Sequence, residues 1–471
     1  MTAGAQDEPS PWDLPVSVVP GVHWPALVHP RAAPLLALLF QLERSQWWSP
    51  EALRRRQLMQ VQALLRHARQ HVPHYRRTLE RGAAPPGALS WEDWQELPIL
   101  TRAELQAAGT TLDSPAVPKS HGGVRELRSS GSTGRPVAVR KTELGALFYQ
   151  AFSLRDHIWH RRDPTGKHAA IRHSPGTPPQ GTTTAGWGSA TRGLYATGPS
   201  AKLHSATDVD SQAAWLLQEG PEYLLAYPSI IEALAEWFLE RGASVPGLRQ
   251  VRSFGEALGP ATRDLARRAW GVTVVDTYSA QEIGQIALQC PQCEHYHVVA
   301  EGVLVEVVDE RNRPCGPGEI GRVLVTPLHN LATPLIRYEI GDHAEVGQAC
   351  PCGRGLPVLT RIIGRSRNLV QLPDGRRYRP AVGINEYAQV APLRQAQLVQ
   401  RTLRDVEARI VVREPLSPAQ EQRLVALIQE SLGHPFNVEL TYVDEVSRSA
   451  SGKFEDFLCL VAPSSGAGEV G

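Results

Sequence analysis

The stretch VRELRSSGSTGRPVAVR, residues 124–140, places a loop of small residues between two runs that favour β-strands. Val124–Leu127 and Arg135–Arg140 are the two predicted strands, and Ser129–Gly134 is the loop that joins them. The loop has four hydroxyl groups and two glycines, so side-chain O–H and backbone N–H groups can converge on an anion such as a triphosphate. It lacks the Gly-Lys-Ser/Thr ending and the following helix of a Walker loop, which argues against a P-loop nucleotidase. Taken alone, the stretch also fits a plain hairpin turn.

Further along the chain, short apolar runs alternate with helical or turn segments, which is the pattern of an α/β protein with a mixed or parallel sheet. The predicted strands are Val251–Phe254, Val272–Thr277, Val303–Val308 and Val323–Val325. Before them, the sequence predicts a helix at Glu51–His71 that begins at Ser49-Pro50. Residues 1–45 are predicted as an irregular arm, and Asp163–Ser200 as loops around strands.

The C-terminal part changes character and predicts a small, separate α+β domain. Strands are expected at Leu398–Leu403, Ala408–Val412 and Val438–Val443, and a helix that starts with a Ser-Pro pair at Ser417–Leu432. We therefore expect three parts: an N-terminal arm at 1–45, a large domain at 46–364 and a small mobile C-terminal domain at 365–471.

The overall charge is nearly balanced, which bounds the kind of partner. The 471 residues carry 49 Lys and Arg against 48 Asp and Glu, a net charge of +1, so no strong field is available to gather nucleic acid or an anionic membrane. The longest apolar run, Ala32–Phe40, is about half the length of a membrane-spanning helix, and no secretory leader is visible. The expectation is a cytoplasmic protein with neither nucleic acid nor membrane as partner.

The cysteines are clustered rather than spread along the chain. Residues 1–289 contain none, whereas Cys290-Pro-Gln-Cys293-Glu-His295-Tyr-His297 and Cys350-Pro-Cys352 hold two close pairs. Paired thiols at this spacing suit tetrahedral Zn²⁺ better than a disulfide framework. The sequence offers more ligand candidates than four positions, and free cysteines are the alternative reading.

Several short motifs follow one another in a fixed order. They are Phe254-Gly255-Glu256-Ala257, Tyr278-Ser279-Ala280-Gln281-Glu282, Arg337-Tyr338-Glu339-Ile340-Gly341-Asp342, Ile363-Gly364-Arg365 and Ser449-Ala450-Ser451-Gly452-Lys453. Each is common by chance, but together with the loop at Ser129–Gly134 they resemble the adenylate-forming superfamily of acyl-CoA synthetases. Within it, the chain resembles the phenylacetate–CoA ligase branch, which includes deazaflavin-coenzyme adenylating synthetases. The resemblance runs from about Glu51 to Lys453.

The resemblance implies the fold of the adenylate-forming enzymes and a site for Mg·ATP. The ATP phosphates would contact Ser129, Ser130, Gly131, Ser132, Thr133, Gly134 and Arg135. Adenine would lie between Tyr278 and the strip Gly255, Glu256 and Ala257. Glu282 would bind Mg²⁺, Asp342 would hold the ribose hydroxyls with help from Arg365, and Lys453 would bridge the substrate carboxylate and the phosphate. A carboxylate that attacks a phosphate needs such cations, because both reactants are anions.

By the same analogy, the acid would bind in a pocket formed by Tyr149, Trp187, Tyr227 and Ser229, whose aromatic rings suit a flat carboxylic acid. Similar enzymes carry a comparable cysteine and histidine cluster, which favours Cys290, His297, Cys350 and Cys352 as the zinc ligands, with Cys293 as the alternative to His297. Four filled positions would make the zinc structural.

The function expected from the resemblance is the ATP-dependent activation of a small-molecule carboxylic acid, followed by transfer to coenzyme A. Adenylation is better supported than transfer, because Arg367 and Asn368 stand where the family usually has an acidic hinge pair. The alternatives are an adenylating ligase with an amine, a carrier-protein thiol or no second acceptor, and a non-catalytic ATP-binding scaffold. A homodimer is left open.

Overall fold

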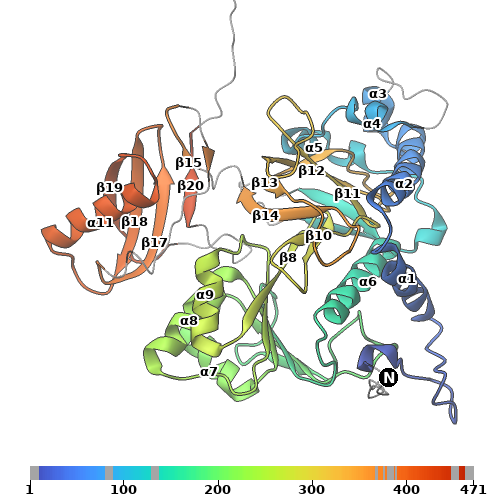
Figure 1. Cartoon of the computed structure of the whole chain (residues 1–471), viewed down its shortest axis with the longest axis horizontal. Coiled ribbons are helices and arrows are strands. Elements are labelled where there is room, and N and C mark those ends of the chain that lie inside the picture. The colour runs from blue at the N-terminus through green and yellow to red at the C-terminus, as the bar shows by residue number, and fades with distance from the viewer. Residues whose placement is uncertain are drawn as a thin grey trace, which may run out of the picture. The chain divides into compact units, whose positions relative to one another are not determined.

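The computed structural model describes residues 10–79, 89–128, 137–365, 370–374, 377–378, 387, 390–446 and 456–461. The chain divides into two compact units, each described here by itself (Figure 1). The first comprises Met1–Ile340 and Ala344–Ile362, and the second comprises Gly341–His343 and Ile363–Gly471. In the described part of the chain, no helix is both long and apolar enough to cross a bilayer.

A 12-stranded mixed sheet organises the first unit, in the order β11-β12-β13-β14-β10-β9-β8-β7-β6-β3-β5-β4. Five neighbouring strands, β5, β3, β6, β7 and β8, run parallel, whereas β4 and β9 flank them antiparallel. The bounds are β3 His168–Arg172, β4 Thr182–Thr184, β5 Ser200–His204, β6 Tyr223–Ala226, β7 Gln250–Phe254, β8 Thr273–Ala280, β9 Gly284–Gln289, β10 Tyr296–Val298, β11 Val303–Val308, β12 Ile320–Pro327, β13 Tyr338–Val346 and β14 Val358–Arg365. The predicted α/β class with a mixed sheet is confirmed.

Helices α7 Val209–Glu219, α8 Pro228–Arg241 and α9 Pro260–Trp270 pack beside the parallel strands (Figure 1). Their apolar faces meet strand side chains such as Ile171, Leu224 and Val251 in one buried cluster. This arrangement follows from the sequence, because parallel strands need helical connections that cover the sheet. It also leaves the carboxyl ends of the parallel strands at one edge, where open α/β sheets bind ligands.

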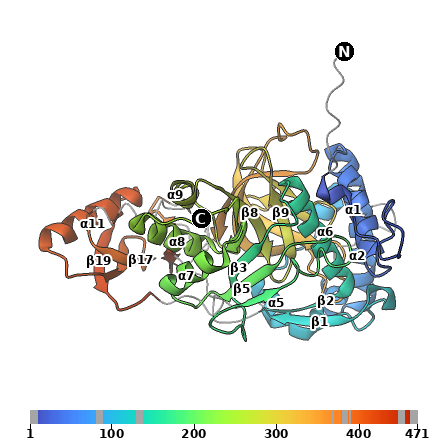
Figure 2. The same ribbon diagram turned by 90° about the horizontal axis from the view of Figure 1, so that it is seen from below.

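The N-terminal helices form the other large part of the first unit. Figure 2 shows α1 Ala33–Ser45 and α2 Pro50–His71 beside α6 Glu143–Trp159. Several shorter elements lie between α2 and α6 along the chain. They are α3 Pro73–Thr78, α4 Trp91–Gln95, α5 Arg102–Ala108, the short 3₁₀ turns η2 Gly109–Leu112 and η3 Lys119–His121, and the hairpin of β1 Val124–Arg128 and β2 Ala138–Thr142. The helix predicted at Glu51–His71 is confirmed, with the Ser49 side chain accepting a hydrogen bond from the Ala52 backbone N–H at 3.2 Å.

The expectation of an irregular segment over residues 1–45 is wrong in part. Residues 11–13 form a 3₁₀ turn, η1 (Pro11–Asp13), and Ala33–Ser45 form helix α1. Pro34 stands in the first turn, where a proline is tolerated, and Leu35, Leu39 and Leu42 lie on one buried face. The high proline content of the arm obscured this helical spacing.

The second unit contains a four-stranded sheet in the order β19-β18-β17-β20, with β17 Leu393–Gln400, β18 Asp405–Val412, β19 Asn437–Tyr442 and β20 Phe457–Cys459. Helix α11 Pro418–Ser431 connects the parallel strands β18 and β19, and Ser417 caps it with a capping box. A two-stranded hairpin, β15 Val370–Gln371 with β16 Arg377–Tyr378, precedes the sheet. The small α+β fold predicted for the C-terminal part is therefore present.

Candidate active site and metal centre

The ends of the parallel strands bring together residues that the sequence assigned to adenine and to the acid. Gly255 follows β7 with a φ of +77°, a left-handed conformation that favours glycine. The Glu256 carboxylate next to it accepts hydrogen bonds from the Ser229 backbone N–H at 3.0 Å and from Ser229 Oγ at 3.2 Å. Ser229 lies in the first turn of α8, where N–H groups lack helical partners. Glu256 thus ties the loop after β7 to the start of α8.

Tyr227 lies in the same region. It precedes α8, and its ring centroid lies 4.7 Å from that of Phe254, the last residue of β7. The His173 backbone N–H donates to its hydroxyl at 3.4 Å. Burial raises the pKa of the Tyr227 hydroxyl, so this group stays protonated near neutral pH.

Trp187 does not lie with Tyr227 and Ser229. Its ring packs against His168 and Tyr223, the first residues of β3 and β6, at centroid distances of 5.8 and 5.5 Å. Tyr227 follows the opposite end of β6, roughly 13 Å further along at about 3.3 Å per residue. The Trp187 Nε1–H donates to the Gly166 carbonyl at 2.9 Å. Trp187 thus belongs to an aromatic cluster at the amino end of the strands, and its place in the acid pocket stays a prediction.

Glu282 occupies the corner between β8 and β9, and it is 5% exposed. Tyr278, also buried, precedes it in β8, where the pairing with β9 shifts register between Tyr278 and Ser279. Such bulges re-aim side chains at the end of a strand. Arg102, the first residue of α5, brings its Nη1 to 3.7 Å from Glu282 Oε1. The Glu282 carboxylate is of the oxygen-ligand type that Mg²⁺ takes in proteins.

Lys141 in β2 is a second cation near Glu282, and the predictions from the sequence omitted it. Burial lowers the pKa of its ammonium group to about 8, and the charge of Glu282 partly offsets this effect. One signal in the sequence pointed to Lys141: the chain has only five lysines, and this one follows the predicted phosphate loop closely. Nothing comparable marked Arg102, which is one of many arginines.

The two residues predicted to hold the ribose, Asp342 and Arg365, lie together in the second unit. Asp342 follows Gly341 in β13, Arg365 ends the neighbouring strand β14, and Arg365 Nε lies 3.9 Å from Asp342 Oδ1. The phosphate loop Ser129–Gly134 with Arg135, the hinge pair Arg367 and Asn368, and Lys453 lie outside the described residues.

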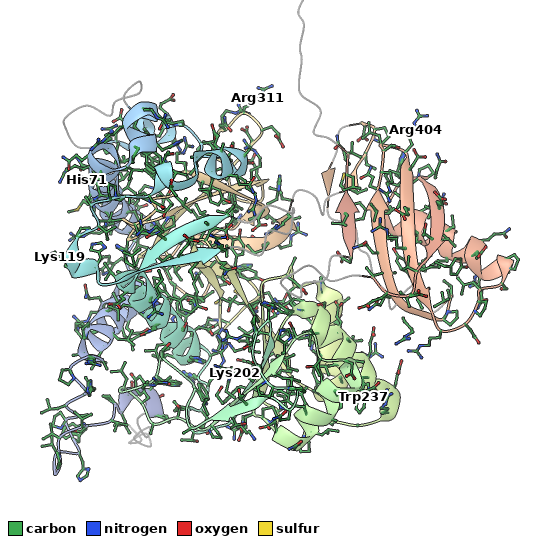
Figure 3. All side chains as sticks on the ribbon, turned by 180° about the vertical axis from the view of Figure 1, so that it is seen from behind. His71, Lys119, Lys202, Trp237, Arg311 and Arg404 are labelled. Atoms are coloured by element: carbon green, nitrogen blue, oxygen red, sulfur yellow. The ribbon has the colours of Figure 1, made fainter. Side chains whose placement is uncertain are left out.

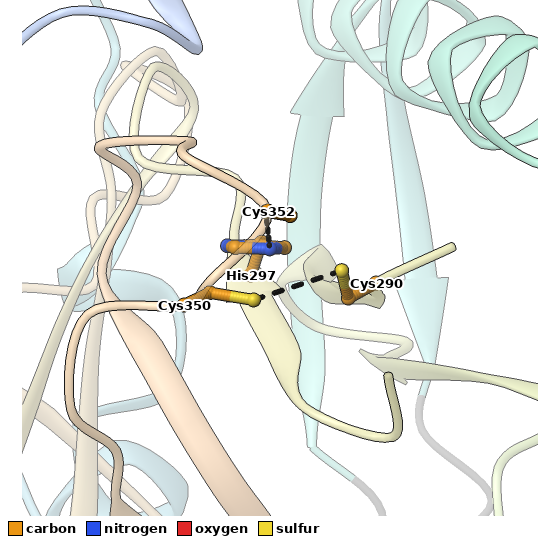
Figure 4. A group of neighbouring side chains, drawn as sticks. All are labelled: Cys290, His297, Cys350 and Cys352. Carbon is orange, nitrogen blue, oxygen red and sulfur yellow. Dashed lines mark hydrogen bonds between the residues drawn. The ribbon is translucent and has the colours of Figure 1, made fainter. Parts of the chain in front are cut away.

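A cluster of sulfur and nitrogen atoms lies between the β9–β10 corner and the loop before β14. Ligand atoms of Cys290, His297, Cys350 and Cys352 all lie within 4.8 Å of one another (Figure 4). Cys350 Sγ is 3.7 Å from Cys290 Sγ, and Cys352 Sγ is 3.3 Å from His297 Nε2. These separations approach the roughly 3.5–3.8 Å between ligands at tetrahedral zinc. The residues present therefore fit the ion that the sequence predicted.

The protonation state of His297 suits a metal ligand. Burial, helped by the charge of Arg354, lowers the pKa of its imidazole to about 4, and metals bind the neutral ring. Cys293 forms a second, overlapping group with His295 and Cys350, with Cys293 Sγ 3.5 Å from Cys350 Sγ. All six cysteines are free of disulfide bonds.

Comparisons with known proteins agree with this fold. A solved structure of 2-hydroxyisobutyryl-CoA ligase, in the postadenylation state in complex with R3-HIB-AMP, gives a TM-score of 0.68 at 21% identity and covers 88% of this chain and 91% of that one. Phenylacetate-coenzyme A ligase of Thermus thermophilus is 26% identical over 446 residues, 87% of this chain and 97% of the relative. Its namesake from Escherichia coli is 29% identical over 329 residues, 67% of this chain and 72% of the relative.

The family model of the CapK C-terminal domain matches residues 381–457. The predicted fold of the adenylate-forming enzymes and the resemblance to phenylacetate–CoA ligases are thus confirmed.

Proposed function

Since the chain has the fold of an adenylate-forming CoA ligase and is similar in sequence to phenylacetate–CoA ligases over 87% of its length, we propose that it activates a carboxylic acid with ATP and transfers the acyl group to coenzyme A. The acid oxygen attacks the α-phosphate of ATP, pyrophosphate leaves, and the thiol of coenzyme A then displaces AMP from the acyl-adenylate. The similarity along nearly the whole chain carries this proposal.

The similarity to these ligases suggests roles for individual residues. Glu256 and Tyr278 would flank adenine, and Asp342 would accept hydrogen bonds from both ribose hydroxyls, because a carboxylate has acceptor oxygens enough for two donors. Glu282 would hold Mg²⁺, which when bound neutralises charge that develops on the phosphates. Lys453 would supply a compact ammonium group between the reacting carboxylate and the α-phosphate, a position that a broad guanidinium fits poorly.

For the cysteine cluster we propose a structural zinc held by Cys290, His297, Cys350 and Cys352. Its support is the number and softness of the ligands, which fill a tetrahedron and leave no open position for a reaction. The ion would join the corner after β9 to the loop at residues 347–357, which contains no helix or strand.

The deciding experiment is acid-dependent exchange of pyrophosphate into ATP, run with a panel of aromatic, aliphatic and dicarboxylic acids. We expect exchange with at least one acid, and consumption of the coenzyme A thiol when that acid, ATP and coenzyme A are combined. Glu282→Ala and Asp342→Ala should each lower exchange at least about tenfold, since a charged contact in a desolvated site contributes about 2–4 kcal/mol. Asp264→Ala, an exposed aspartate of α9, is the matched control.

A second arm separates the two half-reactions. Lys453→Ala should lower adenylate formation about a hundredfold, roughly 3 kcal/mol, and leave transfer from a supplied acyl-adenylate near wild type. Exchange without thiol consumption would support adenylation, but it would mean that the acyl group goes to an acceptor other than coenzyme A. No exchange with any acid, in protein that binds ATP, would overturn the proposal in favour of a binding scaffold.

A further inference from the structure

Lys141 is a partly buried cation without a direct partner among the described residues. No carboxylate oxygen lies within 4.0 Å of its Nζ, and the Nζ donates no hydrogen bond within that part of the chain. An ammonium group removed from water is unfavourable unless a counter-charge or acceptors replace the water. Within the described part of the chain, no residue supplies such a partner to Lys141 at contact distance.

The carboxylate that acts on Lys141 also interacts with a second cation. Glu282 is the carboxylate whose field acts on Lys141, but Glu282 also faces Arg102 at 3.7 Å and is the proposed Mg²⁺ ligand. Three cations, Arg102, Lys141 and the Mg²⁺ ion when it is bound, would then share one carboxylate. The surplus of positive charge favours an additional anion at this place.

A glycine lies beside the ammonium group of Lys141. A Cβ atom placed on Gly284 would lie 3.9 Å from Lys141 Nζ and 3.9 Å from Tyr149 Cδ2. Gly284 has a φ of +110°, a region that residues with side chains rarely adopt. The ammonium group and the edge of a half-exposed aromatic ring thus face a position that holds no side chain.

The backbone around Lys141 is held firmly. The Arg140 N–H donates to Thr333 Oγ1 at 2.9 Å, and the Arg140 carbonyl accepts from Asn330 Nδ2 at 3.0 Å. On the other side, Thr142 Oγ1 caps α6 by accepting from the Gly145 N–H. Tyr149 belongs to that same helix, so the ammonium group and the ring are positioned by one connected piece of structure.

We propose that Lys141 is a specificity-determining residue that binds a second carboxylate of the acid substrate, so that the chain prefers dicarboxylic over monocarboxylic acids. The inference rests on the proposed function, in which Lys453 and Mg²⁺ serve the carboxylate that reacts. The second carboxylate supplies the missing counter-charge, and the spacer between the two carboxylates lies along Gly284 and Tyr149. No residue of the predicted acid pocket, Tyr149, Trp187, Tyr227 or Ser229, carries a charge, so Lys141 adds a selection for charge that those residues lack.

The test compares matched acids in the exchange assay: hexanoate against hexanedioate, and phenylacetate against 4-carboxyphenylacetate. Wild type should favour the diacid of at least one pair in kcat/KM. Lys141→Met should lower the ratio of diacid to monoacid at least about thirtyfold, and Lys141→Arg, which keeps the charge, should retain part of it. The matched control is Lys119→Met, since Lys119 is exposed in η3 at the periphery of the molecule (Figure 3).

Each alternative outcome is informative. An equal loss for monoacids and diacids in Lys141→Met would place the ammonium group at the reacting carboxylate or the phosphates, and would overturn the inference. A wild type that prefers the monoacid of both pairs would do the same. If no acid supports exchange, the shift in melting temperature that each diacid causes without ATP tests the inference separately. A shift that Lys141→Met abolishes would support the inference although the proposed function is wrong. The absence of any shift would overturn both. Far-UV circular dichroism of the variants checks that they fold.

Discussion

Arg102 Nη1 lies 3.7 Å from Glu282 Oε1, so a guanidinium group from the start of α5 faces the carboxylate that follows β8. The arginine side chain is 21% exposed and the glutamate side chain 6%. Two elements that are 180 residues apart in the sequence thus meet at the proposed magnesium ligand. The arginine would compete with a divalent cation for this carboxylate.

This competition leads to a prediction for Arg102→Gln. Removing the guanidinium should lower the Mg²⁺ concentration that gives half-maximal exchange by about two- to fivefold, because a partly exposed ion pair contributes up to about 1 kcal/mol. A titration of exchange rate against Mg²⁺ measures it. Arg102→Lys should keep the wild-type midpoint, and a midpoint that rises in Arg102→Gln would mean that the arginine helps to bind the nucleotide instead.

Local patterns were sufficient for much of the fold. The Ser49 cap and the spacing of Leu53, Val61 and Leu64 mark α2, and the adjacent strands β13 and β14 bring Asp342 and Arg365 together as the motifs suggested. The two pairs of closely spaced thiols pointed to a zinc site, whereas the choice of its four ligands came from the family resemblance and stays a prediction; the structure places those four residues together. In each of these cases the information lies within a few neighbouring residues.

Long-range packing was beyond such patterns. The aromatic ring of Trp187 suggested a pocket residue, and the structure adds that Trp12, His157 and Tyr223, from three distant segments, pack around it. Lys141 and Arg102 become candidate site residues only because they lie near the carboxylate of Glu282, which is far from both in the sequence. Burial and charge pairing arise from tertiary contacts, so the periodicity of the sequence does not predict them.

The cysteine cluster predicts about one zinc per chain in purified protein. A strong chelator should lower the midpoint of thermal unfolding by about 5 °C or more, because a structural zinc contributes several kcal/mol to the folded state. Metal analysis by mass spectrometry and differential scanning calorimetry are the measurements. Active protein that contains no zinc would contradict the assignment.

Single substitutions can distinguish between the two overlapping groups of candidate metal ligands. Cys290→Ser and Cys352→Ser should both lose the metal, whereas Cys293→Ser should keep it, since Cys293 belongs only to the group with His295 and Cys350. Cys315→Ser is the control, because Cys315 belongs to neither group. Loss of zinc in Cys293→Ser together with retention in Cys290→Ser would identify the second group as the binding site.

The N-terminal segment should contribute to stability through Trp12. Its side chain is 5% exposed, its Nε1–H donates to the Arg162 carbonyl at 2.7 Å, and its ring stacks on His157. Trp12→Ala should lower the free energy of unfolding by about 3 kcal/mol, as for other buried tryptophans. Trp24→Ala is the matched control: Trp24 is 80% exposed, so its loss should change the free energy by less than about 0.5 kcal/mol. Equal effects of the two variants in chemical denaturation would show that the segment is not anchored.

The last prediction concerns acid stability and begins with the surroundings of His168. This histidine starts β3, it is buried, and its Nε2 has no hydrogen-bond partner among the described residues. Burial, together with the positive charges of Arg252, Arg162, Arg172 and Lys202, lowers the pKa of its imidazole from 6.5 to about 3. The folded chain therefore keeps His168 neutral over a range in which the unfolded chain has already protonated it.

The sign of the effect follows from this difference. Because the unfolded state binds the proton first, the contribution of His168 to stability is complete above about pH 6.5 and falls steadily as the pH drops toward 3. Between pH 7 and 4.5, wild type should lose about 2–3 kcal/mol more unfolding free energy than His168→Gln, which has no proton to gain. Urea denaturation of both proteins at several pH values measures the difference, in which the acid sensitivity of other groups, the zinc ligands included, cancels. Parallel curves for the two proteins would mean that His168 is charged, or paired, in the folded state.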